Sequence, residues 1–219
     1  MLMTLGKRTL LVIFPVILII QLVASTTAYL TQRASLLGLE QARGLPFGYG
    51  QAGAAPEIYS FGHRNVQGIV YDAELQRLYS HEHGPRGGDE LNLIEPGYNY
   101  GWPLITYGVD YTGAQISPYT ELPGLQQPLL HWTPSVAPSS LTQYRGALFP
   151  EWQGDLFAST LAERSVRRIR LQDGKLAGEE VLFEELDERI RDVRGGPDGA
   201  LYLLTDSPEG RLLRVVPSQ

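Results

Sequence analysis

Short apolar runs separated by turn-forming residues recur along the chain after Glu57. In each unit an apolar pair follows a stretch that contains Gly or Asp, and a second short strand follows after a loop. The pairs are Leu78 with Tyr79, Leu156 with Phe157 and Leu201 with Tyr202, and the later strands cover residues 91–94, 166–170 and 212–215. This repeated order of strands and turns predicts an all-β fold built from blade-like units. No long segment follows the period of about 3.6 residues that marks a helix.

Two details of this pattern refine the predicted architecture. Residues 166–170 mix arginine with apolar residues, which predicts a half-buried strand with its arginines on one face. Residues 97–130 predict a long loop inserted after the first unit. Three units are recognisable, whereas a closed propeller needs roughly four to eight. The chain is therefore expected to form about three blades of a larger ring, with open sheet edges.

The first residues have the order of an export signal. Lys7 and Arg8 precede an apolar run over residues 10–24, and small residues follow up to Ala28. This order predicts a secretory signal over residues 1–28, and hence a periplasmic or secreted protein. The rival interpretation is an uncleaved membrane anchor formed by residues 10–24, although the run is shorter than the roughly 20 residues of a typical span. Residues 29–56 predict a linker, and residues 57–217 the folded part.

Composition narrows the class further. The length of 219 residues allows one sizeable domain, and 24 glycines, 15 prolines and 12 tyrosines favour short strands and tight turns. The net charge of −6, without any basic stripe, argues against nucleic-acid binding. The absence of cysteine excludes disulfides and thiolate metal sites.

Two arginine-containing segments are candidates for ligand binding. Arg64 and Asn65 place several hydrogen-bond donors side by side. Arg189 and Arg191 are two residues apart, so on a strand both point to one face, which suits a polycarboxylate or a phosphate. Taken alone, these residues favour the simpler alternative for the second pair, a solvated strand face paired with the glutamates at positions 184, 185 or 188.

Two further groups raise the question of metal binding. His81 and His83 are also two residues apart and have the spacing of a transition-metal pair on a strand. Without a convincing third ligand, hydrogen-bonded or exposed histidines are the favoured interpretation. Asp89 and Glu90 lie in a glycine-rich stretch that offers carboxylate and carbonyl oxygens, the ligands that calcium prefers.

Taken together, these segments resemble the PQQ-dependent aldose sugar dehydrogenases, the glucose/sorbosone dehydrogenase-like family. Residues 59–68, 80–103, 132–139 and 189–206 carry the resemblance, and the ordered string over residues 83–94 is its most specific part. The resemblance covers residues 45–217 and corresponds to the C-terminal half of the family. The family fold is a six-bladed β-propeller that binds pyrroloquinoline quinone (PQQ) and calcium on its top face.

The resemblance implies roles for particular residues. Arg64, Asn65 and Gln67 are expected to line the cofactor site, with Arg64 beside the reactive quinone oxygens. Arg189 and Arg191 are expected to hold PQQ carboxylates, which reverses the preference stated above for a solvated face.

The resemblance also implies metal and substrate contacts. The carbonyl groups of Gly84 and Pro85 are expected to bind the calcium of the cofactor. Glu90 and the Tyr100 carbonyl correspond to a second, structural calcium site. Trp132 is expected near the sugar.

The implied reaction is the oxidation of an aldose at its anomeric carbon to a lactone, with an external electron acceptor. In the family, a histidine acts as general base, while calcium and the arginine corresponding to Arg64 stabilise negative charge. That histidine belongs to the N-terminal half of the family, which has no counterpart in residues 1–44. None of the four histidines of this chain is assigned its role, so activity is left open.

Several explanations and alternatives remain open. The chain is a truncated remnant, one part of a split propeller completed by another chain, or one half of a homodimer whose two half-propellers close each other. The first of these predicts a non-catalytic protein. A calcium-dependent lactone hydrolase is a further alternative, supported only by a shared propeller fold.

Overall fold

The computed structural model describes residues 57–217, which belong to the second of two compact units, Pro46–Gln219. The predicted signal or anchor over residues 1–28, with its apolar run at residues 10–24, and the predicted linker over residues 29–56 lie outside the described residues. Within residues 57–217, no helix has the length and apolar character needed to cross a membrane.

The described residues form three antiparallel sheets, which confirms the predicted all-β class. The first contains β1 (Val66–Asp72), β2 (Arg77–Glu82), β3 (Asp89–Ile94) and β4 (Leu130–Trp132), in that spatial order. The second contains β5 (Pro138–Gln143), β6 (Leu156–Thr160), β7 (Val166–Gln172) and β8 (Lys175–Leu182). The third contains β9 (Ile190–Gly195), β10 (Leu201–Thr205) and β11 (Leu212–Val215). Two short 3-10 helices, η1 (Pro150–Trp152) and η2 (Glu184–Leu186), lie in the connections.

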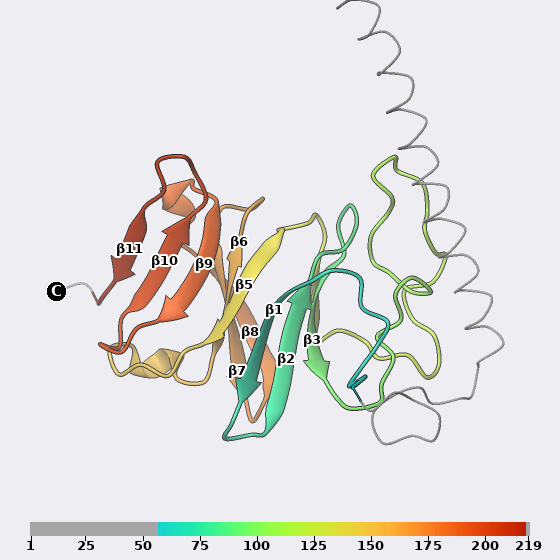
Figure 1. Ribbon diagram of the computed structural model, residues 1–219, viewed down its shortest axis with the longest axis horizontal. Coiled ribbons are helices and arrows are strands. Elements are labelled where there is room, and N and C mark those ends of the chain that lie inside the picture. Colours follow the sequence, from blue (N-terminus) through green and yellow to red (C-terminus); the bar gives the residue numbers. More distant parts are fainter. Residues whose placement is uncertain (1–56, 218–219) are drawn as a thin grey trace, which may run out of the picture. The chain divides into compact units, whose positions relative to one another are not determined.

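The three sheets are arranged as adjacent propeller blades. The strands β1, β5 and β9, which open the three sheets, lie next to one another, and each chain segment then runs outward strand by strand (Figure 1). This is the way a blade is built, from an inner strand at the ring axis to an outer strand at the rim. The structure therefore confirms the expectation of about three blades.

Apolar side chains fill the two spaces between neighbouring sheets. Between the first and second sheets, one cluster joins Tyr79 and Leu91 to Leu156 and its neighbours. Between the second and third sheets, another cluster joins Phe157 to Leu201 and its neighbours. Each fully buried large side chain contributes about 1.5–3 kcal/mol. Packing between sheets, rather than any single sheet, therefore stabilises the fold.

The prediction for the strand at residues 166–170, now β7, was wrong. Val166 packs into the cluster facing the third sheet, whereas Ile169 packs into the cluster facing the first. Arg167 and Arg168 are paired with different acidic residues, Arg167 with Glu179 and Arg168 with Asp155. The strand belongs to the middle sheet, which has a neighbour on each side, so apolar side chains pack on both of its faces, while Arg170 and Gln172 near its end are exposed.

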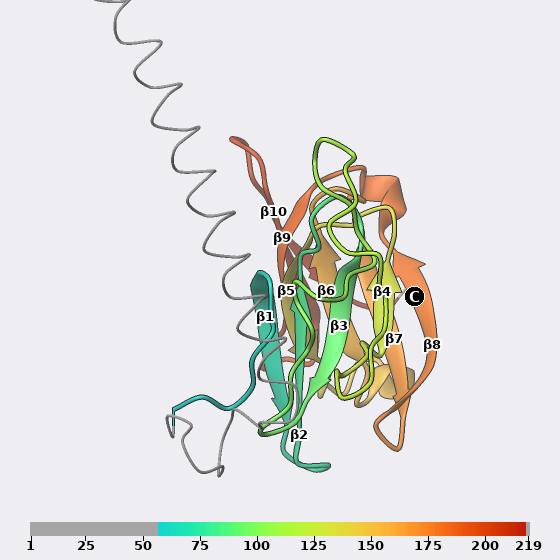
Figure 2. The same cartoon turned by 90° about the vertical axis from the view of Figure 1, so that its right-hand side faces the viewer.

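The outer faces of the first and third sheets expose apolar side chains. Gly68 of β1 faces Leu141 of β5, so the next residue, Ile69, points to the opposite side, where 61% of it is exposed. Leu212 of β11 is 69% exposed. The long loop predicted at residues 97–130 is present between β3 and β4, at the outer end of the first sheet (Figures 1 and 2).

Candidate functional site

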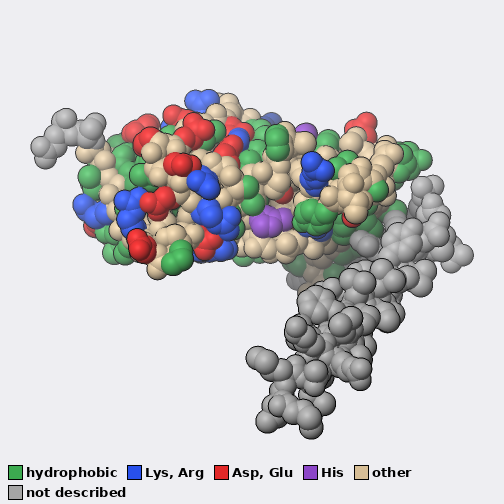
Figure 3. Space-filling view, turned by 90° about the horizontal axis from the view of Figure 1, so that it is seen from above, with side chains coloured by type: hydrophobic (Ala, Val, Ile, Leu, Met, Phe, Trp, Pro, Cys, Tyr) green, Lys and Arg blue, Asp and Glu red, His purple; other side chains and the backbone are tan. Residues whose placement is uncertain are grey.

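The two predicted groups of ligand-binding residues lie at the same end of the inner strands. The segment of Arg64 enters β1, and the segment of Arg189 enters β9. Hydrogen bonds connect these strand entries across the second sheet. His83 Nε2 bonds to the Pro138 carbonyl at 2.7 Å, and Ser139 Oγ donates to the Ile190 carbonyl at 2.8 Å. Seen from this end, histidine surface lies near the middle of the described residues, with cationic side chains on both sides (Figure 3).

The structure brings together three residues predicted to line the cofactor site. The Arg64 guanidinium donates from Nη1 to the carbonyls of His83, at 3.0 Å, and Gly84, at 2.8 Å. The Asn65 carbonyl accepts the His83 N–H at 3.0 Å. Gln67 donates from Nε2 to the Asn65 side-chain oxygen at 2.9 Å. The loop before β1 is thus fastened to the residues that follow β2.

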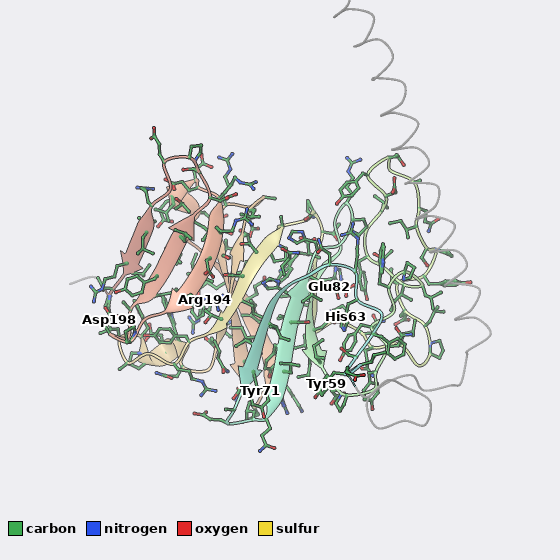
Figure 4. All side chains as sticks on the ribbon, in the orientation of Figure 1. Tyr59, His63, Tyr71, Glu82, Arg194 and Asp198 are labelled. Atoms are coloured by element: carbon green, nitrogen blue, oxygen red, sulfur yellow. The ribbon has the colours of Figure 1, made fainter. Side chains whose placement is uncertain are left out.

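Glu82 is the residue at this site that the sequence reasoning missed. It ends β2 and is only 4% exposed, beside His63 (Figure 4). Its Oε2 accepts the backbone N–H groups of Arg64 and, at 3.1 Å, of Asn65. Its Oε1 lies 3.2 Å from His63 Nδ1. The signal available in the sequence was an acidic residue at the end of a strand. A carboxylate that is buried there requires hydrogen-bond donors around it.

Gly84 and Pro85, the predicted calcium ligands, lie in a buried turn rich in carbonyl groups. The Gly84 N–H donates to Asp89 Oδ1 at 2.9 Å, which ties the turn to β3. A Cβ atom at position 84 would overlap the carbonyl oxygens of Gly87 and Gly88, so only glycine fits there. Carbonyl oxygens crowded in this way are the kind of hard ligand that calcium binds. Within the described part of the chain, no group of three or more His, Asp or Glu side chains has metal-site geometry.

Glu90 and Tyr100, predicted at the second calcium site, line one small cavity together with Arg64, Glu82 and Gly84. Burial raises the pKa of Glu90 to about 7, and the neighbouring charge of Glu82, its register partner, adds to this increase. Burial likewise raises the pKa of Tyr100 to about 12. A larger cavity, lined in part by Arg77 and Leu176, contains none of the predicted site residues.

Arg189 and Arg191 share one face, as predicted, and both contact the carboxylate of Asp206. The distances are 2.9 Å for Arg189 and 3.1 Å for Arg191, and each side chain is 47% exposed. The alternative of pairing with glutamates 184, 185 or 188 was wrong in its partner, because Glu188 bonds Arg211 instead. Hydrogen bonds from Arg189 and then Arg191 lower the pKa of Asp206. Two guanidiniums around one carboxylate leave positive charge available to a ligand.

Trp132 has a position different from that expected of a ligand contact. Its ring is 3% exposed and packs into the cluster between the first and second sheets. Its Nε1 donates to Glu179 Oε1 at 2.6 Å, and the Arg167 guanidinium lies 5.9 Å from the ring centroid. This geometry gives Trp132 a packing role. Its contact with a sugar stays a prediction that the geometry does not support.

His83 is satisfied by a hydrogen bond, as favoured over a metal site, whereas, among the described residues, both ring nitrogens of His81 are buried without a hydrogen-bond partner. His81 is fully buried against Gly68, and this burial lowers its pKa. His83 bonds to the Pro138 carbonyl. The ring of His131 stacks on Tyr107, with a centroid distance of 3.8 Å.

The sequence matches a family of sugar dehydrogenases, and some similar proteins carry the names of such enzymes. Residues 41–214 match the family described as Glucose / Sorbosone dehydrogenase. The Synechocystis protein slr1608 is 48% identical over 163 residues, which are 74% of this chain and 39% of that protein. Aldose sugar dehydrogenase YliI of Escherichia coli is 41% identical over 169 residues, which are 76% of this chain and 46% of that enzyme. The chain spans less than half the length of these relatives.

Solved structures agree with these sequence matches. A crystal structure of a glucose dehydrogenase is 48% identical with a TM-score of 0.73, covering 77% of this chain and 49% of that chain. The PQQ-bound form of aldose sugar dehydrogenase from Streptomyces coelicolor is 30% identical with a TM-score of 0.57, covering 78% of this chain and 48% of that chain. The chain therefore belongs to the Glucose / Sorbosone dehydrogenase family and folds as part of its propeller.

Proposed function

We propose that this chain supplies part of the cofactor site of a PQQ- and calcium-dependent dehydrogenase that oxidises aldose sugars to lactones. One observation carries the proposal. Hydrogen bonds join the entries of the three inner strands at one end of the sheets. At this end lie the Arg64 guanidinium, bonded to the Gly84 carbonyl, and the pair of Arg189 and Arg191. The name of a relative, an aldose sugar dehydrogenase, and the PQQ bound to another support the substrate class and the cofactor.

The residues present fit both bound groups. PQQ is a polycarboxylate, and Arg189 and Arg191 already hold a carboxylate, that of Asp206, between them. The Gly84 carbonyl accepts a hydrogen bond from a cation, the Arg64 guanidinium, and a backbone carbonyl oxygen is the kind of ligand that calcium binds.

When bound, PQQ supplies the acceptor for the hydride that leaves the anomeric carbon of the sugar, and an external acceptor then takes the electrons. Arg64 holds a fixed positive charge beside that reaction, and two carbonyl groups and the Trp102 ring, 5.3 Å away, orient its guanidinium. Arg189 and Arg191 orient the cofactor through its carboxylates. The protein thus contributes orientation and charge, while the redox chemistry belongs to the cofactor.

No histidine within residues 57–217 is placed as a general base. His63 bonds both Ser60 and Glu82, His83 bonds the Pro138 carbonyl, His81 is fully buried, and His131 stacks on Tyr107. In this proposal the proton acceptor comes from a second copy of the chain or from a complementary half-propeller. The competing function is a propeller part that binds the cofactor without turnover.

We also propose export to the periplasm or out of the cell, with residues 10–24 as an anchor if the signal stays uncleaved. The support is the order of cations, apolar run and small residues over positions 7–28. Cell fractionation with N-terminal sequencing tests this. Full-length chain in the cytosol would contradict it.

The test of function is a PQQ titration of the chain with calcium, alongside dye reduction driven by an aldose. Arg191→Ala is expected to weaken PQQ binding by about tenfold or more, because a charge-assisted hydrogen bond is lost. Arg194→Ala is the matched control, since Arg194 lies on the same strand but pairs with Asp192. No PQQ binding by the folded chain would refute the proposal, and binding without dye reduction would favour the competing function.

A further inference from the structure

We propose that Glu82 is a positioning residue, whose buried carboxylate holds Arg64 and Asn65 in the orientation that the cofactor needs. This inference rests on the proposed function. Glu82 does not reach the cofactor itself in this scheme; it acts through the backbone of the loop that enters β1.

The carboxylate of Glu82 bonds three consecutive residues of that loop. Oε2 accepts the backbone N–H groups of both Arg64 and Asn65, and Oε1 bonds His63 Nδ1 at 3.2 Å. These partners are 17 to 19 residues away from Glu82 in the sequence. A carboxylate that accepts two successive backbone N–H groups fixes the orientation of both peptide planes.

The two residues that follow Glu82 also bond this loop. The Arg64 guanidinium bonds the carbonyls of His83 and Gly84, and the Asn65 carbonyl accepts the His83 N–H. Residues 82–84 thus bind the loop through a side chain and through the backbone. With the amides of the loop fixed, the Arg64 side chain starts from a defined point and reaches the Gly84 carbonyl. Without them, the backbone of Arg64 itself would have no bond to β2, and its position would depend on the contacts of the arginine side chain and on the backbone bonds of Gly62 and Asn65.

Neighbouring residues fix the orientation of the carboxylate in turn. Asn92 Nδ2 donates to Glu82 Oε1 at 3.4 Å. His63 bonds Ser60 Oγ through Nε2 at 2.9 Å and stacks on Tyr100, with a centroid distance of 4.7 Å. The side chain of Glu82 therefore has little freedom, which is what a positioning role requires.

Asp72 provides a matched control at the opposite end of the same strand pair. It is also buried, and its Oδ1 accepts two backbone N–H groups, those of Glu74 at 3.0 Å and Leu75 at 3.1 Å. Strand β1 runs from Val66, which pairs with Glu82, to Asp72. Asp72 also bonds the Gln143 amide and pairs with Arg145. Loss of either carboxylate removes two backbone bonds, but only those of Glu82 hold predicted cofactor residues.

The first measurement is hydrogen–deuterium exchange of the full chain without cofactor. Glu82→Gln keeps the size of the side chain but brings an amide N–H₂ where donors already converge, so exchange at Arg64 and Asn65 is expected to rise by about tenfold or more. Asp72→Asn is expected to raise exchange at Glu74 and Leu75 instead. Unchanged exchange at Arg64 and Asn65 in Glu82→Gln would overturn the inference.

The second measurement is a PQQ titration of the same variants with calcium, together with their melting temperatures. Glu82→Gln is expected to weaken PQQ binding by about tenfold, as when one bond to a charged group is lost. Asp72→Asn is expected to lower the melting temperature and leave PQQ binding unchanged. Equal loss of binding in both variants would show a merely structural role. If the wild-type chain does not bind PQQ, the proposed function and the cofactor role of Glu82 fall together, while the exchange data still decide whether the clamp exists.

Discussion

Replacing Glu90 by glutamine is expected to stabilise the chain above pH 7 and to leave its stability unchanged near pH 4. Glu90 lies on β3, part-buried, with the carboxylate of Glu82 as its register partner on β2. Burial and then the charge of Glu82 raise the pKa of Glu90 from 4.5 to about 7. Ionisation of this carboxyl is therefore costly in the folded protein.

The direction and size of the effect follow from that pKa. In the unfolded chain Glu90 ionises near its ordinary pKa of 4.5, whereas the folded protein keeps the proton until about pH 7. Folding stability contributed by this group is thus present below pH 4.5, falls between 4.5 and about 7, and stays low above. The gap between the two pKa values corresponds to roughly 3 kcal/mol, at about 1.4 kcal/mol per pH unit. Glutamine has the same size, can accept the Asn92 hydrogen bond and does not ionise.

Urea unfolding of calcium-free chain between pH 4 and 9 measures this effect. The stability difference between variant and wild type should grow from near zero at pH 4 to a few kcal/mol at pH 8. Glu209→Gln, at an exposed loop position, should show no such growth. Parallel pH curves for Glu90→Gln and wild type would refute the reasoning. Calcium is expected to stabilise the wild type at pH 8 and not the variant, if Glu90 binds it.

Three further predictions test packing and surface. Gly84→Ala should lower the melting temperature by about 5 °C or more, because the new methyl group overlaps backbone carbonyls, while Gly195→Ala, with nothing within 4 Å of its added Cβ, should not. Trp132→Phe should destabilise the chain by about 1–3 kcal/mol, because the hydrogen bond to Glu179 is lost. Its PQQ affinity should stay unchanged, and loss of PQQ binding at full stability would instead support a ligand contact. Ile69→Lys should reduce self-association in sedimentation experiments, because it places a charge on an exposed apolar sheet face, and unchanged sedimentation would contradict this.

The strand pattern was readable from the sequence, whereas the partners of the polar residues were not. The run at residues 212–215 is strand β11, because a local pattern of apolar residues and turns determines strands directly. The pairing of Arg189 and Arg191 with Asp206 depends on how β9 and β10 come together, over 15 to 17 residues. The bonds of Glu82 were not predictable for the same reason, since they form only when the loop before β1 folds against the end of β2.

The burial of β7 and of Trp132 shows a second limit. Alternation along one strand indicates which faces are apolar, but the neighbouring sheet decides whether a polar face is buried as well. Arg167 is tolerated between sheets because Glu163 and Glu179 bond it there. Resemblance placed Arg64, Asn65 and Gln67 in one group. In the structure Arg64 and Asn65 both bond Glu82, and Gln67 bonds Asn65, but their part in cofactor binding stays a prediction.

The serine hydroxyls of β5 that bond β9 have a consequence for how the protein unfolds. Ser139 donates to the Ile190 carbonyl, and Ser140 Oγ accepts the buried N–H of Val193 at 2.9 Å. If the third sheet swung away alone, it would leave these backbone groups without partners and expose the apolar cluster behind them. The His83 bond to Pro138 and the other apolar cluster join the first sheet to the second in the same way. We therefore expect a single unfolding transition that reports the loss of both arginine groups at once.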